Sequence, residues 1–174
     1  MKTGIIIAMA ALGLAIFAVP DTPAEARGGW HHGPDVNQRL SGSTFTLSVD
    51  GETGNTTAMQ NLLAKGQPGS AHIQGLLDFE PVVGPDARCP AEFPLGSTLV
   101  SFEFVETFND GSLLTGAASM GQAVCSDGVA FVADIVGIIT GGTGRFDGAE
   151  GSWEATALTP GNNGITGTLR ADLN

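Results

Sequence analysis

Apolar and polar residues alternate with a period of two along most of the chain beyond residue 42. In the segment 43–50, Phe45, Leu47 and Val49 fall on one face, and hydroxyl side chains fall on the other. Successive side chains of a β-strand point to opposite faces, so this pattern predicts a strand with its three apolar residues buried. The same alternation predicts strands over 71–80, 112–119, 151–159 and 165–173.

The clearest strand pattern covers 97–108. Val100, Phe102, Phe104 and Phe108 share one face, which only Glu106 interrupts. Asn-Asp-Gly follows at 109–111 and predicts a tight hairpin to the next strand. A further segment, 128–140, is apolar on both faces except for Asp134, and we expect a strand there that is buried on both sides.

Three segments lack this alternation. The polar stretch 50–69 predicts a loop, with a short helical turn around 58–65, and the four prolines of 81–94 predict a long connection. Residues 27–42 contain Gly, His, Pro and Asn without periodicity, which indicates a flexible leader. The remainder, 43–174, is expected to be one all-β domain of seven or eight strands. A closed antiparallel barrel of about eight strands is favoured over a β-sandwich, because closure leaves no sheet edge exposed.

The first 26 residues have the features of a signal peptide. Lys2 precedes an apolar run at 4–19, and Ala24-Glu25-Ala26 supplies small residues for cleavage between Ala26 and Arg27. The alternative is an uncleaved membrane anchor, but sixteen apolar residues fall short of the roughly 20 that a bilayer core requires. We therefore expect a secreted or periplasmic protein without stable membrane insertion after cleavage.

Composition narrows the classes of partner. The chain has 18 Asp and Glu against 7 Lys and Arg, a net charge of −11, which opposes binding to nucleic acid or anionic membranes. The 26 glycines favour turn-rich β-structure over a helical bundle.

Two cysteines in an exported chain predict one disulfide, Cys89–Cys125. A cysteine nucleophile paired with histidine is poorly supported, because His31 and His32 fall in the expected leader and His72 has no motif around it. No spacing typical of a metal site occurs, so we expect neither a metal nor a cofactor.

Three carboxylates lie in unusual positions. Asp134 sits in the apolar strand, Glu106 interrupts the phenylalanine face, and Glu103 lies on the opposite face. An internal carboxylate must be ion-paired, hydrogen-bonded or neutral. One interpretation is structural, with a partner such as Arg145; the other is a ligand cavity. The candidates for lining such a cavity are Phe102, Phe104, Glu106 and Asp134.

A glycine-rich segment, GGTGRFDGAEG at 141–151, follows the apolar strand. Its spacing does not fit a dinucleotide-binding turn, it lacks the Gly-Lys-Ser/Thr of a phosphate loop, and too little chain follows for further βαβ units. Glycines at 141, 142, 144 and 148 permit a sharp turn. In such a turn Phe146 can plug one end of the barrel, while Arg145 reaches outward to a carboxylate.

This segment resembles the strand-connecting loop of the allene oxide cyclase and dirigent barrel superfamily. It is especially similar to small exported bacterial members without assigned activity, which also show a comparable hairpin and Cys pair. The resemblance implies an eight-stranded antiparallel barrel, often oligomeric, with an apolar cavity. The plant activities of the superfamily, ring closure of an epoxide and control of phenoxy-radical coupling, use cavity tyrosines, and this chain has no Tyr.

The function expected from the sequence is therefore a non-enzymatic exported β-barrel. It would be either a binding module for a small apolar ligand or a structural envelope module, and a homo-oligomer is a further expectation. The alternative is a cyclase-like lyase or isomerase acting inside the barrel. That alternative requires Asp134, Glu103 or Glu106 to point into a cavity.

Overall fold

The computed structural model describes residues 35–160 and 164–174. The expected signal peptide, its Ala26–Arg27 cleavage site and both leader histidines lie outside this range. The described residues form β1 (Val36–Val49), β2 (Thr56–Gln67), β3 (Ala71–Pro85), β4 (Leu95–Phe108), β5 (Leu113–Ala118), β6 (Ala123–Ser126), β7 (Phe131–Thr143), the single-turn helix η1 (Gly144–Phe146), β8 (Gly151–Thr159) and β9 (Gly164–Leu173).

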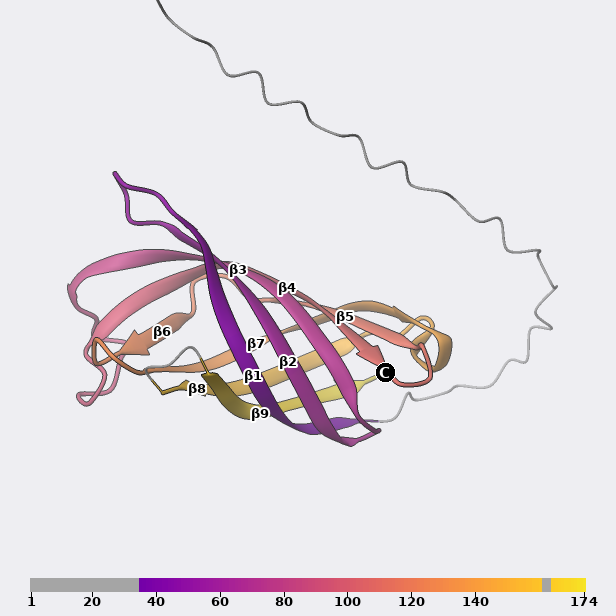
Figure 1. Cartoon of the computed structure of the whole chain (residues 1–174). Helices are drawn as coiled ribbons and strands as arrows, with labels where there is room; N and C mark the ends of the chain where they lie inside the picture. Colours follow the sequence, from indigo (N-terminus) through magenta and orange to yellow (C-terminus); the bar gives the residue numbers. More distant parts are fainter. Residues whose placement is uncertain (1–34, 161–163) are drawn as a thin grey trace, which may run out of the picture. The chain divides into compact units, whose positions relative to one another are not determined.

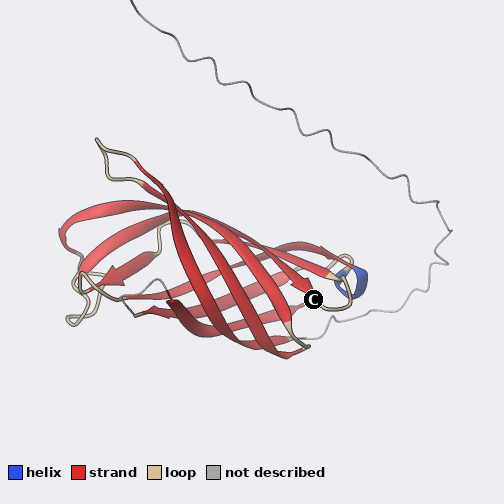
Figure 2. Ribbon diagram, viewed as in Figure 1, coloured by secondary structure: helices blue, strands red, loops and turns tan. Residues whose placement is uncertain are grey.

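The strands close into an eight-stranded antiparallel barrel with one additional short strand, β6. Figures 1 and 2 show this arrangement. Each strand from β1 to β4 pairs with the next, β5 pairs with β7, β7 with β8, and β8 with β9, which returns to pair with β1. The short β6 fills the rest of the gap between β4 and β7, because β5 pairs with the second half of β4 and β6 with its first half. The all-β class and the closed barrel predicted from the sequence are confirmed.

The first strand is longer than predicted, and its buried face is the opposite one. β1 begins at Val36, inside the stretch expected to be a flexible leader, and it buries Val36, Gln38 and Leu40. Since alternate residues of a strand face the same side, Thr44 and Thr46 also point into the barrel. Phe45 and Leu47 therefore face outward and are 48% and 56% exposed. Beyond a register shift between Thr46 and Ser48, Val49 borders the interior cavity but is 61% exposed. The prediction that these three residues are buried was wrong.

Two further predictions are corrected by the pairing. Residues 56–67, expected to be loop with a helical turn, form β2, since Ala58, Leu62 and Ala64 alternate inward between β1 and β3. The expected connection from Pro81 is shorter than predicted, because β3 continues to Pro85.

Contrary to expectation, the strand around Asp134 is not buried on both faces: Val136 and Ile138 on β7 are 50% and 59% exposed.

An aromatic cluster fills the middle of the barrel. The rings of Phe102 and Phe104 lie 5.8 and 5.3 Å from that of Trp153, edge to face, an arrangement that aromatic pairs prefer. The rings have this space because glycines face them: an added methyl at Gly75 would meet Phe102, and one at Gly137 would meet Trp153. The Trp153 indole N–H donates to the Ala117 and Ile138 carbonyl oxygens at 3.2 and 3.1 Å.

Candidate functional site

One end of the barrel, which we call the open end, holds a cavity of about 410 Å³. It lies inside the strands near the β1–β2 and β3–β4 connections. Both connections are at the left of Figure 1. Its polar lining comes chiefly from Thr44, Thr46, Thr56, Gln60, Ser97 and Thr159. Its apolar lining comes chiefly from Ala58, Leu77, Phe79, Val124, Phe131 and Ile135.

No charged side chain lines this cavity within the described part of the chain. That is notable for a protein with 18 acidic residues. A cavity with apolar walls and a few hydroxyl and amide groups suits a neutral molecule, because a buried charge without a partner is strongly disfavoured.

The cavity narrows towards the middle of the barrel. A second, much smaller space of about 40 Å³ lies beneath it and shares Gln60, Ile135 and Ala157 with it. The rings of Phe102, Phe104 and Trp153 line this deeper space. The two predicted candidates Phe102 and Phe104 thus form the floor beneath the cavity, and they do not line its main volume.

A disulfide bond and an ion pair hold the rim of the open end in place. The predicted disulfide is confirmed: Cys89, in the β3–β4 connection, is bonded to Cys125 on β6. In the same connection the Arg88 guanidinium pairs with the buried Asp86 carboxylate at 2.6 Å and donates to the Gly121 carbonyl oxygen at 2.9 Å. The charge-assisted hydrogen bonds from Arg88 lower the pKa of Asp86. These contacts hold the rim in one shape, which limits the ordering that a ligand must impose.

The opposite end, which we call the closed end, is plugged by η1. Phe146 is 1% exposed and its ring lies 4.7 Å from that of Phe108. The Arg145 guanidinium stacks 4.4 Å from the Phe108 ring and pairs with Asp110 at 3.4 Å. The plug formed by Phe146 and the outward reach of Arg145 are therefore confirmed.

The glycines of this loop allow the chain to pack closely enough for Phe146 to close this end of the barrel. A methyl group added at Gly142 would lie 2.6 Å from the Phe146 carbonyl oxygen, and one added at Gly144 would lie 2.5 Å from the Ser112 hydroxyl oxygen. Gly144 and Gly148 also have positive φ angles of 64° and 73°, which favour glycine. Gly141, in the last part of β7, completes the predicted segment.

Glu106 is the one predicted carboxylate that lies inside the barrel. It is fully buried near the closed end, between Ile73 of β3 and Leu114 of β5, and neither of its oxygens has a hydrogen-bond partner of good geometry. Burial raises the pKa of Glu106 to about 7, against smaller lowering effects of the Gln38 amide and the Arg145 charge. Glu106 is thus separated from the open-end cavity by the aromatic cluster.

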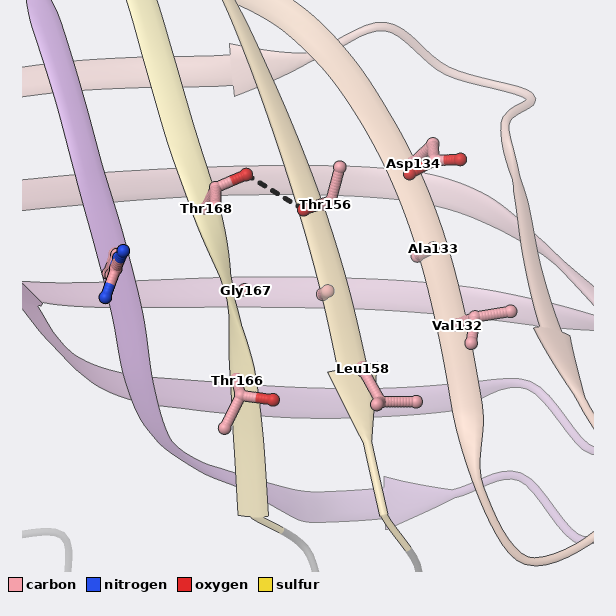
Figure 3. A pocket seen from close by; sticks show the side chains of 10 residues that line it. Val132, Ala133, Asp134, Thr156, Leu158, Thr166, Gly167 and Thr168 are labelled. Carbon is pink, nitrogen blue, oxygen red and sulfur yellow. Dashed lines mark hydrogen bonds between the residues drawn. The ribbon is translucent and has the colours of Figure 1, made fainter.

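The other two carboxylates point away from the interior. Glu103 and Asp134 are exposed on the outer faces of β4 and β7. Asp134 borders a depression on the outer wall of β7, β8 and β9, where Thr156 and Thr168 are hydrogen-bonded at 2.9 Å (Figure 3). The depression has a volume of about 430 Å³ but lies open to solvent, whereas small-molecule sites enclose most of their ligand. Asp134, a candidate for lining an internal cavity, is therefore on the outside of the barrel.

No protein-family model matches this chain, and no curated protein matches it in sequence. Among residues 35–160 and 164–174, no three His, Cys, Asp or Glu side chains are grouped so as to hold a metal ion. Within the same residues, no helix is long and apolar enough to cross a membrane.

Proposed function

We propose that this protein is an exported β-barrel that binds a small, uncharged, largely apolar molecule in its open-end cavity. The observation that carries the proposal is the uncharged lining of that cavity in a chain of net charge −11. Its volume of about 410 Å³ falls within the roughly 300–1,000 Å³ typical of ligand pockets. The disulfide at the rim supports export, because such bonds persist in oxidising compartments.

The form of the cavity defines the ligand further. The Thr44, Thr46 and Thr159 hydroxyls near the mouth suit a hydroxyl or carbonyl group, and the aromatic floor suits an apolar end. We also propose membership of the allene oxide cyclase and dirigent superfamily, which the closed eight-stranded antiparallel barrel supports. The cyclase-like alternative gains no support, since Glu103 and Asp134 face outward and Glu106 lies outside the cavity.

The proposal is tested by titrating the protein with a neutral fluorescent probe, N-phenyl-1-naphthylamine. We expect saturable binding to the wild type and loss of binding in Thr46→Glu, which places a charge at the cavity mouth. Thr166→Glu makes the same change on the outer wall and should leave binding intact. Equal binding by both variants would contradict the proposal, as would the absence of saturable binding by the wild type.

A further inference from the structure

The outer face of β1–β4 carries six large apolar side chains whose exposed fractions range from 36% to 56%. They are Phe45, Leu47, Met59, Leu63, Leu76 and Val105. Phe45, Met59 and Leu76 are direct cross-strand neighbours and form one row over three strands. Clusters of exposed apolar residues on adjacent strands are characteristic of interaction surfaces. We call this surface the β1–β4 face.

Basic residues border the β1–β4 face towards the closed end. Arg39 of β1 lies directly opposite Lys65 of β2, and both side chains are exposed on the outside of the barrel. Among the described residues neither has a hydrogen bond or an ion pair through its side chain. Like charges placed directly opposite each other on a sheet are destabilising, so this pair favours the arrival of an acidic group from outside.

An acidic residue borders the same face towards the open end. The Asp78 carboxylate of β3 accepts hydrogen bonds of 2.7 Å from the Ser101 and Thr57 hydroxyls. These bonds lower the pKa of Asp78, so it remains ionised at neutral pH. The face is therefore basic at one border and acidic at the other. Its middle is apolar on β1, β2 and β3, and on β4 the exposed Glu103 lies beside Leu76.

We propose that the β1–β4 face binds the β1–β4 face of a second copy of this chain, in a two-fold symmetric dimer. A two-fold axis across the strands near Asn61 reverses the rows of one copy relative to the other. Met59 and Leu63 lie two residues on either side of Asn61, so Met59 of one copy meets Leu63 of its partner. Lys65 and Thr57 lie four residues on either side, and Thr57 pairs in register with Asp78. Lys65 of one copy therefore lies opposite the partner's Thr57 and within reach of the partner's Asp78 on the neighbouring strand.

This self-complementarity is the reason to choose a second copy as the occupant. An isologous interface requires a surface that matches itself after a two-fold rotation, and the apolar and charged rows here meet that condition. The net charge of −11 opposes association in general. Local pairing of Lys65 with Asp78 offsets that repulsion where the copies touch.

Sedimentation velocity of the full mature protein over a wide concentration range tests the proposal. We expect a dimer that Met59→Glu converts to a monomer. Ile138→Glu, which also places a carboxylate at an exposed apolar residue but on the outer face of β7, should remain dimeric. A wild type that is monomeric throughout, or a dimer that survives Met59→Glu, would overturn the proposal.

Charge reversal tests the orientation of the two copies. Lys65→Glu and Asp78→Lys should each raise the dimer Kd by about tenfold, which corresponds to roughly 1.4 kcal/mol, and the double variant should recover most of that loss. Failure of the double variant to recover would show that these residues do not face each other and would overturn this dimer. Circular dichroism of each variant checks that the barrel is folded.

Discussion

Glu106→Gln should make the stability of this protein nearly independent of pH between 5 and 8. In the wild type the folded barrel buries the carboxyl group among apolar side chains, and its oxygens have no well-placed donor. The unfolded chain exposes the same group to water. The folded state therefore holds the proton more tightly than the unfolded state.

The sign and size follow from the two pKa values of Glu106. The pKa rises from 4.5 to about 7 on folding. The stabilising contribution is complete below pH 4.5 and is lost as pH rises through 7. At about 1.4 kcal/mol for each pKa unit, the loss is of the order of 3 kcal/mol. Asp50, Asp78 and Asp86 have lowered pKa values, so they act in the opposite direction, but in a more acidic window.

Urea denaturation at several pH values between 5 and 8 measures this effect. The wild type should lose stability as pH rises, whereas Glu106→Gln should remain nearly constant and become the more stable protein at pH 8. Glu103→Gln, a matched change three residues away on the outer face of the same strand, should follow the wild type. Parallel pH profiles for the wild type and Glu106→Gln would show that Glu106 does not cause the pH dependence of stability.

Three further predictions concern the supports of the barrel. Replacing both Cys89 and Cys125 with serine should cost about 3–4 kcal/mol of unfolding free energy for this 36-residue separation, measured by urea denaturation. Phe146→Ala should cost about 3–5 kcal/mol by emptying the closed-end plug, yet leave probe affinity unchanged in fluorescence titration. Gly137→Ala should cost about 1–3 kcal/mol, because the added methyl would collide with the Ala117 carbonyl oxygen and with the Trp153 ring; an unchanged melting temperature would contradict this.

Strands with one apolar and one polar face could be predicted from the sequence with their correct orientation. β4 buries Phe102, Phe104 and Phe108 as expected. β8 spans the predicted residues 151–159, with Trp153 inside. These strands cross the middle or the closed end of the barrel, where the interior is filled by side chains and the inward residues are apolar.

The same rule failed at the open end for a physical reason. The inward residues of β1 there are Thr44 and Thr46, which line a cavity, while Phe45 and Leu47 face outward. An inner wall with hydroxyl groups and an outer wall with apolar ones inverts the usual pattern. The position of Glu106 relative to the cavity could not be predicted from the sequence, because it depends on pairing between strands that are far apart in the chain.

The central claim, that the open-end cavity holds a small uncharged ligand, is tested most directly by native mass spectrometry. The protein should be isolated gently from the exported fraction of its own cells. We predict a reproducible mass excess of one small molecule per chain, present in the wild type and in Thr166→Glu and absent from Thr46→Glu. A bare wild-type mass, or an excess that persists in Thr46→Glu, would contradict the claim.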